Sequence, residues 1–261
     1  MAKKLAKVAI GVDIGGTGIK GCPVNLKTGE FIGKRKRIPT PPNAAPEEIA
    51  DIVKTIVDHF ELPTDTPVGV TFPAPVVNGV VLNMANLSKD FIGMNVADLF
   101  SKVLERPVVV FNDADAAGFA EARYGAAHGR NGTIMVLTLG TGIGSALVRN
   151  GVLVPNTELG HILLDNGVSA ENFAANSVRE KLELSFEDWA ERLQKVFTTV
   201  ENLFSPDLFI IGGGISKKSD QFLPMITTRA PIAPAELLNT AGIVGAALSA
   251  AIIARGEITE E

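Results

Sequence analysis

The chain has 261 residues, of which 46% are hydrophobic and 20% are charged, enough to bury one large core or two smaller ones. Its net charge of -5 argues against a nucleic-acid partner, and its single cysteine, Cys22, cannot build a disulfide framework or a cysteine-based zinc site. The first residues lack an apolar signal core, and no stretch approaches the roughly 18 apolar residues that span a bilayer, so we expect a cytoplasmic protein without membrane contacts.

The first glycine-rich motif follows a short apolar strand predicted over residues 8–13. A tight turn over residues 14–18 leads into a returning strand over residues 19–24. Dinucleotide-binding and P-loop motifs need a helix directly after their glycines, so this strand–turn–strand segment matches neither motif. A glycine-rich hairpin can still bind phosphate through its backbone N–H groups, with the Thr17 hydroxyl and the Lys20 charge beside them. An ordinary hairpin turn is the alternative.

A basic segment and several regular elements complete the first half. Residues 30–38 predict a third strand, whose Lys34-Arg35-Lys36-Arg37 run is either a solvated sheet edge or a path for a polyanion. Apolar periodicity and turn residues predict a helix over about 46–60, a buried strand over 68–72, a hairpin over 76–82 and a helix from Asn95 that ends before Pro107.

The central apolar run, residues 108–111, ends in Asn112 and Asp113, and a helical pattern continues to about Tyr124. Asp113 would then lie where a strand ends and a helix begins, which is where ligands collect in open α/β sheets. A carboxylate beside an amide suits a general base that takes a proton from a hydroxyl. The alternative is that one of the two residues only caps the helix.

The second half begins like the first, with a strand over 133–139, a glycine-rich turn over 140–144 and strands over 145–148 and 152–154. This repetition predicts two related lobes that face each other across a cleft. The later elements are a polar loop containing Glu158 and His161, a helix over 168–175, a helix from Ser185 to about Phe204, a buried strand over 208–211 ended by Gly212-Gly213-Gly214, a helix near 221–223 and a small-residue helix over 240–248.

Three glycine-rich turns, each after a strand, indicate a site for a nucleotide or another phosphoryl donor. Phosphoryl transfer needs backbone donors for the phosphates, a base for the acceptor hydroxyl and usually Mg²⁺. Asp113 suits the base, and Asp13 could hold Mg²⁺ through water.

Five motifs, in this order, resemble those of the repressor–ORF–kinase (ROK) family of sugar kinases. They are Asp13–Lys20, Phe111–Ala117, Leu137–Gly144, Glu158–His161 and Gly212–Gly214. Within that family, residues 37–41 and 214–218 and the short length resemble the branch that uses inorganic polyphosphate. The resemblance implies an α/β, actin-like (ribonuclease H-like) two-lobed fold with glucose in the interlobe cleft. We expect a small N-terminal lobe of residues 1–111 and 241–261, and a larger C-terminal lobe of residues 112–240.

The resemblance also implies roles for individual residues. Asp113 would be the catalytic base. The expected sugar ligands are Asn86, Asn112, Asp113, Glu158, His161 and Glu171. The expected phosphate ligands are Gly15, Gly16, Thr17, Lys20, Gly140, Thr141, Gly142, Gly213, Lys217 and Lys218. Much of the family carries a cysteine-rich zinc motif after the Glu-x-Gly-His loop, but residues 163–171 contain no cysteine, so we expect no zinc.

The implied activity is that of a phosphotransferase with an alcohol acceptor, in which the 6-hydroxyl of glucose is phosphorylated from inorganic polyphosphate and from ATP. The family resemblance also implies a homodimer. One alternative is a strictly ATP-dependent glucokinase or glucomannokinase. Another is a sugar-sensing regulator, but such proteins carry an N-terminal helix-turn-helix segment, and here the first strand begins by about Val8. A third, an actin-like ATPase, does not account for Glu158 and His161.

Overall fold

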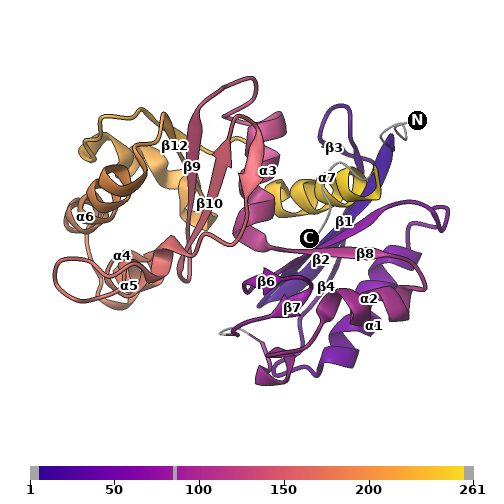
Figure 1. The fold of residues 1–261 in the computed structure, drawn as a ribbon. Helices are drawn as coiled ribbons and strands as arrows, with labels where there is room; N and C mark the ends of the chain where they lie inside the picture. Colours follow the sequence, from indigo (N-terminus) through magenta and orange to yellow (C-terminus); the bar gives the residue numbers. More distant parts are fainter. Residues whose placement is uncertain (1–5, 85–86, 256–261) are drawn as a thin grey trace. The chain divides into compact units, whose positions relative to one another are not determined.

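The computed structural model describes residues 6–84 and 87–255, which fold into two compact units (Figure 1). The first unit comprises Met1–Ala120 and Thr240–Glu261, and the second comprises Glu121–Asn239. The division falls inside helix α3 (Asp113–Tyr124). Each unit is a mixed β-sheet with helices against it, so the α/β class predicted from the sequence is confirmed.

The first unit contains a sheet in the order β3-β2-β1-β5-β8, and β4 also pairs with β2. Its strands are β1 (Val8–Gly15), β2 (Gly18–Asn25), β3 (Glu30–Phe31), β4 (Lys36–Ile38), β5 (Val68–Phe72) and β8 (Val108–Asn112). Strands β1, β5 and β8 are parallel, so their carboxyl ends meet at one edge of the sheet. The short strands β6 (Val76–Val77) and β7 (Val80–Val81) form the predicted hairpin.

Helices cover both faces of the first sheet. One face packs on α1 (Pro46–Asp58) and α2 (Val96–Leu104) through a core that includes Val12 and Ile56, and α7 (Ala241–Arg255) lies on the other face (Figure 1). Gly11 and Gly69 allow this second contact, because a Cβ at either position would lie 1.9 Å from a carbonyl oxygen of α7. The helix therefore rests directly on the backbone of β1 and β5.

The second unit repeats this topology in its sheet, whose order is β11-β10-β9-β12-β13. Its strands are β9 (Thr133–Leu139), β10 (Ile143–Arg149), β11 (Val152–Val154), β12 (Leu208–Gly212) and β13 (Ile232–Pro234). In both sheets an antiparallel meander is followed by two parallel strands, which confirms the repetition predicted from the sequence.

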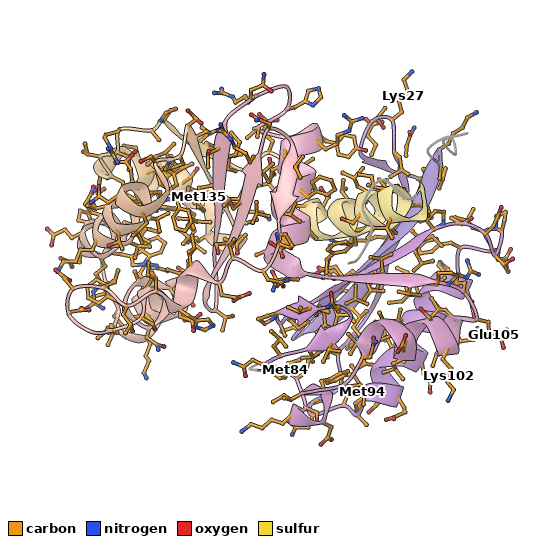
Figure 2. All side chains as sticks on the ribbon, in the orientation of Figure 1. Lys27, Met84, Met94, Lys102, Glu105 and Met135 are labelled. Carbon is orange, nitrogen blue, oxygen red and sulfur yellow. The ribbon has the colours of Figure 1, made fainter. Side chains whose placement is uncertain are left out.

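The core of the second unit lies between its sheet and the helices α4 (Ala170–Ala174) and α6 (Phe186–Phe204). Met135 on β9 is fully buried in this core, whereas Lys102 and Glu105 of the first unit point outward from α2 (Figure 2). Ser185 caps α6 as predicted, because its hydroxyl accepts the Asp188 N–H at 3.1 Å. The remaining segments are α5 (Asn176–Lys181) and the 3₁₀ turns η1 (Lys89–Phe91), η2 (Leu159–His161), η3 (Gly214–Gln221), η4 (Leu223–Met225) and η5 (Leu238–Thr240).

Two local predictions were wrong, and one strand was missed. The single strand expected over 30–38 is two short strands, because Gly33 between them has a φ of +83° that breaks the extended backbone. The helix expected near 221–223 is 3₁₀ structure, in which Lys218 departs from helical dihedral angles. Strand β13 was missed because it contains Pro234, and proline is tolerated only in edge strands such as this one. Within the described ranges, no helix is long and apolar enough to cross a bilayer.

Candidate active site

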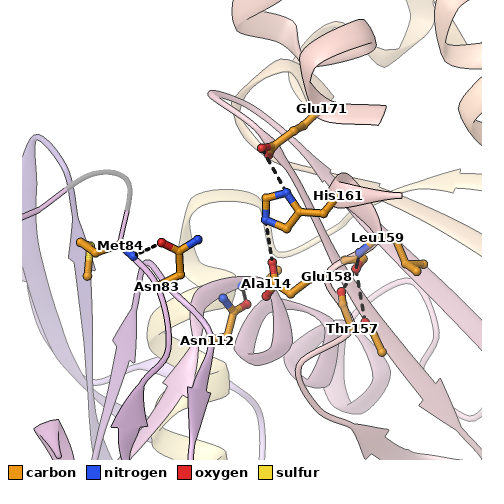
Figure 3. A network of polar contacts seen from close by, with 10 residues as sticks. Asn83, Met84, Asn112, Ala114, Thr157, Glu158, Leu159, His161 and Glu171 are labelled. Atoms are coloured by element: carbon orange, nitrogen blue, oxygen red, sulfur yellow. Dashed lines mark hydrogen bonds and ion pairs between the residues drawn. The ribbon is translucent and has the colours of Figure 1, made fainter. Parts of the chain in front are cut away.

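The junction between β8 and α3 presents the predicted catalytic carboxylate. Asn112 is 8% exposed, and its Oδ1 accepts the N–H groups of Ala114 at 2.8 Å and Asp115 at 3.2 Å (Figure 3). The amide is therefore the helix cap. Asp113 is exposed in the first turn of α3, where the helix dipole favours the charged carboxylate. Asp113 Oδ1 also lies 2.8 Å from the Ala114 N–H, so the side chains of Asn112 and Asp113 both accept hydrogen bonds at the start of α3.

Asp13 lies near the carboxyl end of β1, at the same sheet edge as Asp113. The buried Thr71 hydroxyl donates to Asp13 Oδ1 at 2.8 Å, and Lys20 Nζ lies 3.6 Å from Oδ2. Asp13 remains 22% exposed. No group of three or more potential protein ligands for a metal occurs in the described part of the chain. One oxygen donor nevertheless fits Mg²⁺, which is often held by one or two carboxylates together with substrate phosphates.

The first glycine-rich turn is braced by two side chains that sequence reasoning did not place there. Thr40 Oγ1 donates to the Gly15 carbonyl oxygen at 2.6 Å, and Arg37 Nη2 donates to the Thr17 carbonyl oxygen at 2.9 Å. Both residues belong to the 37–41 segment that carries part of the family resemblance, and Arg37 also belongs to the basic run over residues 34–37. Gly16 and Thr17 at the tip of the turn are exposed.

In the second unit, Glu158, His161 and Glu171 form one cluster (Figure 3). His161 Nε2 lies 3.8 Å from Glu158 Oε2, and His161 Nδ1 lies 3.4 Å from Glu171 Oε1. The three side chains are between 30% and 57% exposed, so they remain accessible to a ligand. All three were expected sugar ligands, and the structure brings Glu171 of helix α4 beside the loop that carries Glu158 and His161.

Ser145 on β10 fixes the loop that carries this cluster. Its hydroxyl donates to the Thr157 carbonyl oxygen and accepts the Leu159 N–H at 3.0 Å. Ser145 is 3% exposed and was not predicted to have a role, because a serine in an apolar strand gives no signal of its loop partner. The two bonds set the backbone on both sides of Glu158.

The second glycine-rich turn lies directly against this cluster. A Cβ on Gly142 would lie 2.6 Å from Glu171 Oε2, so a larger residue there would push the carboxylate out of its present position. On the other side of the turn, Ser177 donates from Oγ to the Thr141 carbonyl oxygen at 2.5 Å and from its N–H to the Gly140 carbonyl oxygen at 3.1 Å. The predicted phosphate turn and the predicted sugar ligands are thus neighbours within one unit.

The third glycine-rich turn lies beside the second. Gly212 at the end of β12 pairs with Thr138 of β9, and a Cβ on Gly213 would lie 2.2 Å from the Leu139 carbonyl oxygen. Lys217 and Lys218 follow in η3, and both are exposed, without an ion-pair partner among the residues that the structure describes. Asn86, the remaining predicted sugar ligand, lies outside the described residues.

Partial burial raises the pKa of Glu158. Burial is the main cause, the positive charge of His161 opposes it, and the Glu171 carboxylate adds to it. Glu158 therefore takes up a proton more readily than an ordinary glutamate, as expected for a partly buried carboxylate.

We predict that Glu158→Gln changes the pH dependence of stability. A raised folded-state pKa stabilises the native protein below the ordinary value of 4.5, and this contribution is lost as the pH rises through the folded-state pKa. The melting temperature of the wild type, relative to that of Glu158→Gln, should therefore fall between pH 4 and pH 7. Glu191→Gln, at an exposed position of α6, is the control. A difference that stays constant or grows with pH would contradict the shift.

Comparison with known proteins identifies the family of the chain. Residues 9–175 match the ROK family. Polyphosphate glucokinase of Mycobacterium tuberculosis is 47% identical over 240 residues, which cover 92% of this chain and 89% of that protein. The crystal structure of the inorganic polyphosphate/ATP-glucomannokinase of Arthrobacter sp. strain KM is 50% identical, with a TM-score of 0.89 over 95% of this chain and 100% of that one. A ROK family glucokinase from Streptomyces griseus, solved with glucose and AMPPNP, is 26% identical with a TM-score of 0.79 over 93% and 99% of the two chains. The chain is therefore a member of the ROK family and shares the two-lobed, actin-like fold of its sugar kinases.

Proposed function

We propose that this protein phosphorylates glucose at its 6-hydroxyl, with inorganic polyphosphate as the preferred phosphoryl donor and ATP as a second donor. The observation that carries the proposal is the exposed Asp113 carboxylate at the sheet edge that also holds Asp13 and the first glycine-rich turn. The relatives named polyphosphate glucokinase and polyphosphate/ATP-glucomannokinase, at 47% and 50% identity, support the choice of substrates.

In the proposed reaction, Asp113 acts as the general base. The glucose 6-oxygen attacks the terminal phosphorus of the donor while its proton passes to a carboxylate oxygen of Asp113. The new oxygen–phosphorus bond forms as the bond to the bridging oxygen breaks, and the shortened polyphosphate or ADP leaves with the electron pair. The transition state is loose, so positioning and charge neutralisation contribute most of the rate.

Sugar recognition is assigned to groups that can pair with several hydroxyls. The carboxylates of Glu158 and Glu171 accept hydrogen bonds, and the His161 imidazole can donate or accept. The cluster is accessible and is held by the Ser145 bonds, which supports this role. We assign Asn112 and Asn86 further sugar contacts. His161 is a sugar ligand in this proposal, not a zinc ligand.

Donor binding is assigned to the glycine-rich turns and the cations beside them. The backbone N–H groups of Gly15, Gly16, Gly140, Gly142 and Gly213 would meet phosphate oxygens, helped by Thr17, Thr141 and Lys20. Asp13 would hold Mg²⁺ through water. When bound, Mg²⁺ neutralises charge on the phosphate oxygens. The hydrogen bond from Thr71 and the ion pair with Lys20 keep the Asp13 carboxylate oriented for that contact.

We predict that Asp113→Asn lowers kcat by roughly 10²- to 10⁴-fold, the usual cost of a lost general base. Asparagine keeps the shape of the side chain but cannot take the proton, so glucose affinity by calorimetry should change little. Turnover is measured by coupling glucose 6-phosphate to its dehydrogenase.

The matched control for this variant is Asp98→Asn, which removes an exposed aspartate from the first turn of α2 in the same unit. It should leave kcat near the wild-type value. Near-normal turnover by a folded Asp113→Asn protein would end the assignment of the base.

We predict that replacing Lys217 and Lys218 together by alanine raises the KM for long polyphosphate more than the KM for ATP. A long polyanion contacts many cations at once, so its binding should also weaken steeply with salt, by analogy with nucleic acids. The KM for glucose should remain nearly unchanged. Donors are compared at equal total phosphate.

The control for the double variant removes two other exposed cations of the second unit, Lys181 and Arg130. An equal effect on both donors, or none, would place the polyphosphate path elsewhere. If the wild type uses ATP alone, the better description is an ATP-dependent glucokinase.

We also propose that the protein is a homodimer, as its family resemblance implies. Light scattering at micromolar concentration should give twice the mass of the 261-residue chain. The mass of a single chain would reject the dimer.

A further inference from the structure

Four side chains form a polar row across the first sheet. In the strand register, Thr71 of β5 pairs with Asp13 of β1, Asp13 pairs with Lys20 of β2, and Lys20 pairs with Arg37 of β4. Residues directly opposite each other on neighbouring strands point to the same face. The row therefore passes from a hydroxyl to a carboxylate and then to two cations.

Arg37 is held in a defined position although it is exposed. Its Nη2 donates to the Thr17 carbonyl oxygen at 2.9 Å. A Cβ on Gly18 would lie 2.7 Å from Arg37 Nε and 2.9 Å from Cζ, so the guanidinium occupies the space that glycine leaves open. The hydrogen bond fixes one corner of the group and the backbone supports its plane. The charge is thereby anchored at the first glycine-rich turn.

Lys20 and Arg37, the two cations of the row, differ in whether a carboxylate lies beside them. Lys20 has the Asp13 carboxylate at 3.6 Å. In residues 6–84 and 87–255, Arg37 has no carboxylate within ion-pair distance. An arginine presents five N–H donors, and the bond to Thr17 uses one. Arg37 thus offers an uncompensated, planar set of donors that matches the geometry of phosphate oxygens.

The distance from the candidate base decides which phosphate Arg37 could reach. The Arg37 guanidinium lies over Gly18 of β2, and within the first unit β2 is separated from β8 by the two strands β1 and β5. Three spacings between neighbouring strands amount to roughly 14 Å. The phosphoryl group that is transferred must lie beside the base at the end of β8, so Arg37 meets the donor beyond that group.

We infer that Arg37 binds a phosphate of the donor that is not transferred and so favours long polyphosphate over ATP. This inference rests on the proposed function. A long polyphosphate presents phosphate oxygens along its whole length, whereas a nucleotide presents its sugar and base beyond three phosphates. Arg37 is therefore a specificity residue of the first unit, independent of Lys217 and Lys218.

The test measures KM for long polyphosphate, tripolyphosphate and ATP, at saturating glucose, in the wild type, Arg37→Ala and Arg37→Lys. Arg37→Ala should raise the KM for long polyphosphate by about tenfold to a hundredfold, the range for a lost charged hydrogen bond. The KM values for tripolyphosphate and ATP should rise less, and the KM for glucose should not change. Arg37→Lys keeps the charge but loses the planar donors, so its KM for long polyphosphate should lie between those of the wild type and Arg37→Ala.

The control is Lys27→Ala, which removes one exposed positive charge from the turn between β2 and β3, at the end of β2 away from the first glycine-rich turn (Figure 2). It should leave every KM unchanged. A similar rise in KM for all donors, together with a lower melting temperature, would show that Arg37 only braces the turn. An unchanged KM for every donor would also overturn the inference. If the wild type itself does not use polyphosphate, the proposed donor and the inference fail together, which differs from a failure of Arg37 alone.

Discussion

The first unit depends on the close approach of α7 to the sheet beneath it. Gly11 on β1 and Gly69 on β5 bring the strands within contact of the α7 carbonyl groups, and Gly245 on α7 does the same for Ala116 of α3. These contacts involve backbone, which cannot rotate out of the way. The last described helix of the chain is therefore fixed to strands built from its first 72 residues, and Gly242 brings the start of α7 against Asp13.

Parallel strands explain why chemistry gathers at one edge of each sheet. In the first unit, β1, β5 and β8 end together and bring Asp13, Thr71 and Asp113 to one edge although they are far apart in sequence. In the second unit, β9 and β12 end together and make the glycine-rich turns neighbours. The same topology thus produces two different sites. The first is rich in charge, and the second combines glycine-rich turns with the cluster of Glu158, His161 and Glu171.

Patterns local in sequence predicted much of this arrangement. The strand–turn–strand motifs, the junction at Asp113 and the family were all recognisable, because each depends on neighbouring residues. Contacts between distant segments were not. Nothing in the sequence around Ser145 identifies Thr157 and Leu159 as its partners, and the position of Arg37 over Gly18 depends on the pairing of β4 with β2.

The two short strands at the margin of the first sheet also bear on solubility. Strands β3 and β4, of two and three residues, share the outer side of β2, with Gly33 between them. A long uninterrupted edge strand would expose a row of unpaired backbone groups to another sheet, and short strands with lysine or arginine prevent such growth. The break at Gly33 and the charges of Lys36 and Arg37 therefore protect this edge against strand addition and aggregation.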